Sequence, residues 1–257
     1  MKSSLSVVFI CIGSVSAFNS FFAPPKAQRN VAPPPSKVEI NSWLDEKLKY
    51  PEPPTFDVLA KTIEFAQCTS YEQVEKFYDD DYVFRGSIIG PINADDVRET
   101  QKGFNILDAY PDLETRPFGF TVDPDNPYRC YYFERWEGTH AGAISVGPTE
   151  YPPTNDFIKL PTHIMSLNWT PEGKVIYACL SAPLDRFEGK TRGSGAVLGL
   201  LIGAGLNLGE ASVGNGGLRI AQRLAHLFGG LGRNWSKEAD IPSWWKSKAR
   251  GADPTDL

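Results

Sequence analysis

Six side chains between residues 85 and 163 have the chemistry for acid–base work on a small molecule. Taking a proton from carbon requires a base within reach of that carbon and a donor for the oxyanion that develops. Asp112 and His140 are the candidate catalytic groups. The candidate pocket residues are Arg85, Tyr132, Glu134 and His163. Together they predict a polar site suited to proton transfer.

A hairpin predicted in the second half of the chain would bring two of these residues together. If the chain reverses near Tyr151, antiparallel pairing places His140 opposite Thr162 and His163. We therefore expect His140 and His163 to lie close together on neighbouring strands.

Each candidate also has an ordinary structural interpretation. His140 could hold the hairpin through a hydrogen bond within the sheet, and Asp112 could cap a turn. Arg85 could pair with an acidic neighbour in the run Asp79 to Asp81. That acidic run is itself expected at a solvated helix end.

Composition and spacing argue against several classes of function. The chain has 257 residues, a formal net charge of −5 and no basic stripe interleaved with aromatics, so we expect no nucleic-acid partner. His140 and His163 lack a third nitrogen or a carboxylate at ligand spacing, so no metal site is predicted. The stretch after Gly193 fails the dinucleotide fingerprint because its sixth position is Leu198, and no cofactor is predicted.

The first 37 residues are typical of a removable two-part presequence. Residues 1–17 have the form of a signal peptide, in which Lys2 is followed by an apolar run and by the small residues Val15-Ser16-Ala17. Residues 18–37 are basic and proline-rich and contain no Asp or Glu, as expected of a transit peptide. With Phe18 directly after the cleavage site, the leader resembles the bipartite leaders of algae whose plastids derive from a red alga.

The leader predicts a chloroplast protein, in the stroma or associated with the thylakoid. Without these residues the formal charge falls from −5 to about −9, so the body is acidic. Ordinary secretion is the alternative, and it would make Asn168 and Asn234 acceptors for glycosylation.

The pattern of apolar residues predicts one α+β domain over residues 55–190, preceded by a linker or short helix at 38–54. Helices are predicted at 55–66, 71–78 and 97–109, and a short strand at 82–86. Strands of an antiparallel meander are predicted at 114–122, 128–146, 156–168 and 174–183.

Six segments of this domain resemble, in sequence and order, the SnoaL-like domain of the nuclear transport factor 2-like superfamily. They are Asp79-Asp80-Asp81-Tyr82-Val83-Phe84-Arg85, Gly90-Pro91, Tyr110-Pro111-Asp112-Leu113, Gly138-Thr139-His140-Ala141-Gly142, Pro152-Pro153-Thr154 and Glu172-Gly173-Lys174-Val175-Ile176. The resemblance implies a cone-shaped curved antiparallel sheet wrapped by three N-terminal helices, with an apolar pocket and often a homodimer. Its members include polyketide cyclases, isomerases, epoxide hydrolases and non-catalytic binders, so the fold leaves the activity open.

The chain departs from the cyclases of that family at the last predicted strand. The resemblance implies an aspartate base there, whereas Val175 to Pro183 contains no carboxylate. If the protein is an enzyme, Asp112 or His140 must therefore supply the base. Arg85, Tyr132 and Glu134 are next in line.

Residues 191–257 are predicted to form a helical C-terminal extension. Three glycines recur at every fourth position of an apolar run: Gly195, Gly199 and Gly203. Such spacing allows close helix packing, and the run is too short to span a bilayer. Trp244 and Trp245 lie in a basic tail. The extension could cover its own domain, dock on a partner or enter a membrane.

The sequence thus predicts a plastid SnoaL-like protein that binds an apolar, oxygen-bearing small molecule. Whether it also isomerises or cyclises that molecule is left open. The alternative is a non-catalytic accessory or assembly subunit of a thylakoid complex, held through the C-terminal extension.

Overall fold

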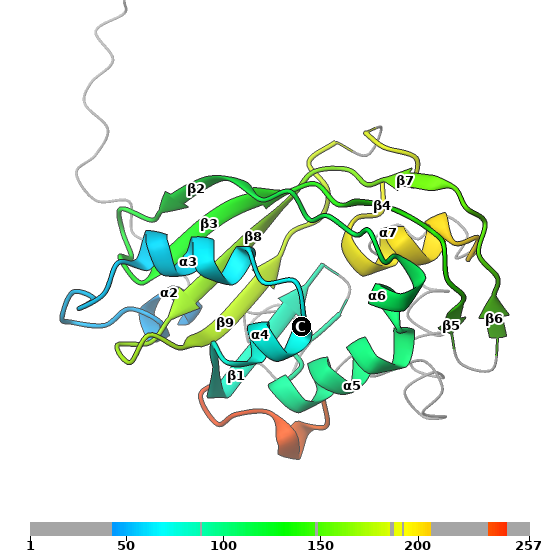
Figure 1. Ribbon diagram of the computed structural model, residues 1–257. Coiled ribbons are helices and arrows are strands. Elements are labelled where there is room, and N and C mark those ends of the chain that lie inside the picture. The colour runs from blue at the N-terminus through cyan, green and yellow to red at the C-terminus, as the bar shows by residue number, and fades with distance from the viewer. Residues whose placement is uncertain are drawn as a thin grey trace, which may run out of the picture. The chain divides into compact units, whose positions relative to one another are not determined.

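The computed structural model describes residues 43–87, 89–146, 149–185, 188–191, 193–206 and 236–245. The predicted leader and residues 207–235 of the extension lie outside these ranges. Within them, a curved sheet combines with short helices, which confirms the α+β class (Figure 1). No helix among the described residues has the length and apolar content needed to cross a membrane.

The main sheet has five strands, in the order β1-β9-β8-β3-β2. They are β1 (Tyr78–Gly86), β2 (Phe118–Val122), β3 (Arg129–Glu134), β8 (His163–Trp169) and β9 (Val175–Leu180). The neighbours β2, β3, β8 and β9 pair antiparallel, whereas β1 joins β9 in parallel. The predicted meander therefore carries one parallel edge strand.

Two small hairpin sheets extend the long strands predicted from the sequence. They pair β4 (Glu137–Thr139) with β7 (Phe157–Lys159), and β5 (Ile144–Val146) with β6 (Thr149–Tyr151). The chain reverses between Val146 and Thr149, because these two residues are the last pair of the hairpin.

This turn position makes the predicted hairpin register wrong. The backbone N–H of His140 donates to Asp156, and His163 stands opposite Glu134 instead of His140. The turn lies a few residues before the expected position near Tyr151, so every pairing beyond it is displaced.

The helices lie mostly on one side of the main sheet (Figure 1). They are α2 (Trp43–Lys47), α3 (Val58–Ala66), α4 (Tyr71–Glu75), α5 (Ala94–Phe104), α6 (Ile106–Ala109), α7 (Ala196–Gly203) and the short 3-10 helix η1 (Glu238–Asp240). The Asp57 carboxylate caps α3 by accepting the Ala60 N–H at 2.9 Å. The single helix predicted at 97–109 is divided because Asn105 has a φ of 51°.

The boundary between α4 and β1 also differs from the prediction. The helix ends at Glu75, and Tyr78 already belongs to β1. The acidic run Asp79 to Asp81 therefore lies in a strand and not at a helix end.

Trp169 is the centre of one hydrophobic cluster, beneath α3. Its side chain is fully buried and its Nε1–H donates to the Thr62 hydroxyl at 3.0 Å. The Thr62 hydroxyl in turn donates to the Val58 carbonyl at 2.7 Å. We call this group the Trp169 cluster; it includes Val58, Phe65, Tyr82, Tyr128, Cys130, Tyr132, Met165, Leu167 and Trp169.

A second hydrophobic cluster lies where α7 packs on the hairpin strands. The Tyr110 hydroxyl, which is buried, donates to the Leu200 carbonyl at 2.6 Å. We call this group the Leu200 cluster; it includes Ile106, Tyr110, Ile144, Ile158, Leu160, Leu200 and Leu201. The described part of the extension thus buries apolar side chains against its own domain.

The opposite face of the sheet is covered over β1 and β9 by both ends of the described chain. Trp244 and Trp245 pack there with Leu48, Val83 and Tyr177. The Trp244 Nε1–H donates to the Asp81 carbonyl at 2.8 Å. This outer face is therefore buried within one chain at these strands.

The glycines of α7 provide the first test. A Cβ at residue 199 would lie 2.5 Å from the Ser194 carbonyl oxygen and would clash with the Leu160 side chain. Gly199→Ala should therefore lower the free energy of unfolding, measured in urea, by about 1 to 3 kcal/mol.

Gly103→Ala is the matched control, because a Cβ at this α5 position meets no atom within 4 Å. It should raise the free energy of unfolding by roughly 0.5 to 1 kcal/mol through helix propensity. Equal effects of the two substitutions would contradict the close packing of α7.

Candidate functional site

Three of the predicted pocket residues meet on the core-facing side of the main sheet. Tyr132 and Glu134 are two residues apart on β3 and therefore share a face, and His163 lies directly opposite Glu134 on β8. Glu134 is 6% exposed and His163 is not exposed at all. We call these residues, together with Trp136, the Glu134 cluster.

The Glu134 carboxylate holds the His163 ring. Its Oε2 lies 3.2 Å from His163 Nε2 and also accepts the Trp136 indole N–H at 2.9 Å. The Trp136 ring meets the imidazole edge-on, with centroids 5.9 Å apart. With a carboxylate as the acceptor, Nε2 of His163 carries the hydrogen of this bond, and its Nδ1 has no hydrogen-bond partner among the described residues.

Tyr132 supplies a hydrogen-bond donor beside this pair. Burial, followed by the neighbouring charge of Glu134, raises the pKa of the Tyr132 phenol well above its usual value. The phenol therefore stays protonated near neutral pH. The phenol also hydrogen-bonds Glu134, so an imidazole, an indole and a phenol surround one buried carboxylate.

The other side of these strands is braced by an acidic residue of the following segment. Glu188 accepts the Thr162 backbone N–H at 2.8 Å and forms an ion pair with Arg135. Arg135 also donates to the Thr162 hydroxyl at 3.1 Å. Since Arg135 and Thr162 adjoin Glu134 and His163 in sequence, these contacts fix the backbone at the Glu134–His163 pair.

The Glu134 cluster lies at the junction of the two hydrophobic clusters. Tyr132 and Met165 belong to the Trp169 cluster, and Trp136 packs against the Leu200 cluster. Met165 stands opposite Tyr132 on β8. Polar groups are thus buried where apolar side chains border them on two sides.

Arg85 does not join these residues. It pairs in register with Cys179, and its neighbour Val83 packs in the cluster of Trp244 on the outer face. The guanidinium donates to the carbonyls of Ile89 at 3.3 Å and Gly90 at 2.6 Å. Arg85 thus holds the loop after β1, and no ion pair with the acidic run Asp79 to Asp81 is formed among the described residues.

Asp112 is exposed and caps the neighbouring strand. Its two carboxylate oxygens accept the backbone N–H and the hydroxyl of Thr139, each at 2.7 Å. These hydrogen bonds lower the pKa of Asp112. The turn-capping interpretation describes these contacts, and a role as base stays a prediction.

His140 holds the end of the β4–β7 hairpin. Its Nδ1 accepts the Thr154 N–H at 3.2 Å, and its ring stacks on Tyr110 with centroids 5.2 Å apart. Burial lowers the pKa of His140, against the opposing charge of Asp156. The contacts of His140 are thus those of a sheet-fixing histidine, and they differ from those of His163.

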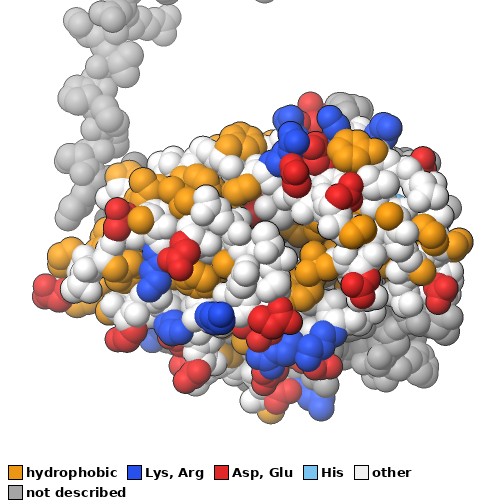
Figure 2. Space-filling view, in the orientation of Figure 1, with side chains coloured by type: hydrophobic (Ala, Val, Ile, Leu, Met, Phe, Trp, Pro, Cys, Tyr) orange, Lys and Arg blue, Asp and Glu red, His pale blue; other side chains and the backbone are white. Residues whose placement is uncertain are grey.

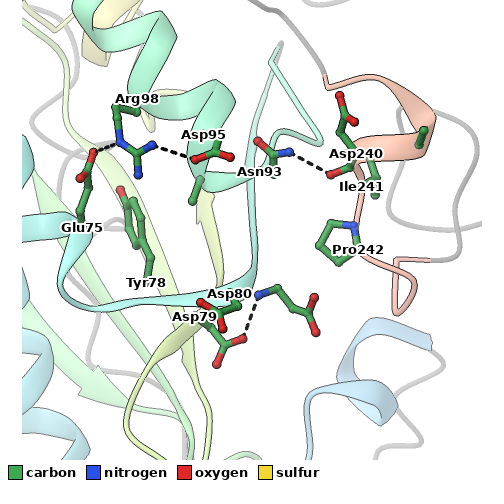
Figure 3. Close-up of a pocket in the computed structure, with 13 residues that line it drawn as sticks. Glu75, Tyr78, Asp79, Asp80, Asn93, Asp95, Arg98, Asp240, Ile241 and Pro242 are labelled. Carbon is green, nitrogen blue, oxygen red and sulfur yellow. Dashed lines mark hydrogen bonds and ion pairs between the residues drawn. The ribbon is translucent and has the colours of Figure 1, made fainter.

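A separate acidic groove of about 460 Å³ lies between the start of β1, the start of α5 and residues 239–242 (Figure 3). Arg98 bridges Glu75 at 2.6 Å and Asp95 at 2.8 Å. Burial raises the pKa of Tyr78, which lines this groove, to about 12. Charged side chains of both signs gather over α4 and α5 in Figure 2. The groove is polar, unlike the surroundings of the Glu134 cluster.

Within the described ranges, no group of three or more His, Cys, Asp or Glu side chains is placed to hold a metal ion. Trp136 and Glu188 were not predicted as site residues. The two-residue spacing of Glu134 and Trp136 within the strand predicted at 128–146 could have indicated Trp136. Glu188 contacts Thr162 and Arg135, which lie far from it in the sequence, so no local pattern indicated these contacts.

No family model and no curated protein matches the sequence. Similar solved structures include AclR, described as a hydroxylase of Streptomyces galilaeus, at 18% identity over 67% of this chain and 94% of that one, with a TM-score of 0.43. A polyketide cyclase of Xanthomonas campestris has 11% identity over 51% and 93%, with a TM-score of 0.41. A SnoaL-like polyketide cyclase of Jannaschia sp. CCS1 has 11% identity over 48% and 83%, with a TM-score of 0.38. At such identities and scores these likenesses concern the fold and leave substrate and activity open.

The pKa of His140 gives a pH test of its structural role. A histidine whose pKa is lowered in the folded protein binds a proton more readily in the unfolded chain. The free energy of unfolding therefore falls as the pH drops below 6.5, the ordinary pKa of histidine. His140→Gln should therefore flatten the fall in unfolding free energy between about pH 7 and pH 5.5, by at most about 1.4 kcal/mol per pH unit. Urea unfolding at several pH values measures this. An unchanged slope would show that His140 is not held neutral by its surroundings.

Proposed function

We propose that this chain is a plastid protein that binds an apolar, oxygen-bearing small molecule against the Glu134 cluster and isomerises or cyclises it by proton transfer. The observation that carries the proposal is the buried contact of Glu134 with His163 between two hydrophobic clusters. The leader supports the plastid location through its acid-free second part and small-residue cleavage site.

Stability alone gives no reason for this contact. Taking a carboxylate and an imidazole out of water is costly, and well-packed apolar residues often serve a core equally well. Buried acid–base pairs with a specific partner are in contrast frequent at functional sites. The sheet has apolar residues at the adjoining positions Met165 and Leu167, so a polar pair at this depth has a use other than packing.

The surroundings suit a ligand that is mostly apolar. The side chains next to the pair are aromatic or aliphatic, including Tyr132, Trp136 and Met165. Figure 2 shows hydrophobic side chains recessed between α4 and α6 near the middle of the view. Apolar lining with a few fixed polar groups is the usual composition of small-molecule sites.

The polar groups fit a proton transfer without a metal or cofactor. His163 Nδ1 can accept a proton, and Glu134 stabilises the imidazolium that results. The Tyr132 phenol, which hydrogen-bonds Glu134, can turn this hydrogen to a ligand oxygen on which negative charge develops. Return of the proton to another atom of the same substrate is an isomerisation. Attack of the carbanion on a carbonyl carbon of the same substrate breaks the C=O π bond, the proton goes to the resulting alkoxide oxygen, and the net reaction is a cyclisation.

The alternative function, an accessory subunit held by the C-terminal extension, needs apolar side chains free for a partner. In the described part of that extension, Leu200, Leu201, Trp244 and Trp245 are buried against their own domain. This burial supports the pocket interpretation over the docking one.

Purification of the protein from its native plastid, with separation of stroma from membrane, tests both functions. Native mass spectrometry should find a co-purifying small molecule. With that compound, Glu134→Gln should lower turnover by about 10²-fold or more, because the amide no longer stabilises an imidazolium, while affinity changes only a few-fold.

Glu150→Gln is the control, since Glu150 is an exposed carboxylate on β6. It should leave turnover unchanged. A bound compound without product from the native protein would identify a binder. A stoichiometric protein partner without any compound would instead support the accessory subunit.

A further inference from the structure

Trp136 contacts both members of the buried acid–base pair, although the proposed proton transfer does not use it. Its indole Nε1–H donates to Glu134 Oε2 at 2.9 Å, and the same oxygen lies 3.2 Å from His163 Nε2. Its ring also meets the His163 ring edge-on, at an interplanar angle of 64°. One partly buried side chain therefore borders the carboxylate and the imidazole together.

The two contacts at Oε2 restrict the Glu134 carboxylate. The terminal torsion of a glutamate is broad, so a carboxylate that is held by one hydrogen bond can still turn about its axis. With Trp136 and His163 bonded to the same oxygen, the carboxylate has less freedom to turn away from the imidazole. A displacement of about 1 Å can lower a catalysed rate by about 10²-fold, so this restriction bears directly on proton transfer.

The indole is itself held from two sides. β3 ends two residues before Trp136, and β4 begins directly after it. In this connection the Trp136 carbonyl accepts the Leu160 N–H at 2.9 Å, and the Arg135 N–H donates to the Thr115 carbonyl at 3.0 Å. The ring packs against the Leu200 cluster. A fixed backbone and a packed ring give the indole N–H a defined direction toward Glu134.

We infer that Trp136 is a positioning residue, which orients the Glu134 carboxylate for the proton transfer at His163. This inference rests on the proposed function. Because the indole acts through Glu134 and not on the substrate, its loss should slow the chemical step and leave substrate binding nearly unchanged. A tryptophan that served packing alone would lower stability without this division.

The probe 5-nitrobenzisoxazole tests the inference on the full chain without the natural substrate. It is an apolar, oxygen-bearing ring system with an acidic C–H bond. A base takes the hydrogen from the carbon next to the ring nitrogen, the electrons of the C–H bond form a nitrile as the N–O bond breaks, and a coloured phenolate results. The native protein should convert the probe with saturable kinetics, faster than free imidazole at the same concentration.

Trp136→Phe keeps an aromatic ring and removes the indole donor. It should lower kcat by about tenfold, a part of the 10²- to 10⁴-fold contribution of a positioned base, and change KM by no more than about twofold. Trp244→Phe is the matched control, because the Trp244 Nε1–H also donates at 2.8 Å, to the Asp81 carbonyl on the outer face. It should leave both constants unchanged. Circular dichroism and thermal unfolding check that both variants fold.

The same substitution in the Glu134→Gln background shows whether Trp136 acts through Glu134. Groups that act as a unit are not additive, so Trp136→Phe should there lower kcat by no more than about twofold further. The comparison separates a positioning role from general damage to the fold, which would lower kcat by the same factor in both backgrounds.

The remaining outcomes separate this inference from the proposed function. Equal losses of kcat in Trp136→Phe and Trp244→Phe would assign the indole to packing, and a tenfold further loss in the Glu134→Gln background would show that it acts independently of Glu134. Either result overturns the positioning role and leaves the proposed proton transfer standing. If the native protein does not convert the probe faster than free imidazole, the proton transfer itself fails, and the positioning role fails with it.

Discussion

The antiparallel pairing of β3 with β8 is the constraint on which the candidate site depends. It places Glu134 opposite His163 and Tyr132 opposite Met165. Because side chains alternate between the two faces of a sheet, a slip of one residue would separate the acid from the imidazole. The pairing is fixed at one end by the buried Trp169, bonded to Thr62 of α3. At the other end, the contacts of Glu188 hold it.

The C-terminal extension contributes to both faces of this sheet. On the core side, α7 approaches closely because Gly199 and Gly203 face Leu160 and Ile158, and its N-cap, Gly195, lies beside His163. On the outer side, Trp244 and Trp245 bury Val83 and Tyr177 of β1 and β9. The described parts of the extension, at α7 and at residues 236–245, therefore belong to the packed domain.

The two polar regions of the protein differ in what their charges can do. In the acidic groove, Arg98 and its partners Glu75 and Asp95 are partly or largely exposed, so water and salt screen their attraction. The Glu134 cluster is buried, where an interaction between charges is stronger and an unpaired polar atom is costly. The raised pKa of Tyr132 follows from that burial. Charges in the buried cluster therefore interact more strongly than those of the solvated groove.

The sequence by itself determined the elements whose signals are local. Apolar spacing predicted α3 and the strands of the meander, and the four-residue glycine repeat predicted a closely packed helix at α7. Residue type alone selected Tyr132, Glu134 and His163, and the alternation of side chains along β3 put the first two on one face.

Tertiary structure decided the rest. The turn between Val146 and Thr149 set the strand register, which places His163 opposite Glu134 and not opposite His140. The parallel pairing of β1 with β9 placed Arg85 on the outer face of the sheet. Partners across a sheet depend on where distant turns fall and on how helices pack, and neither is encoded in the period of a single strand.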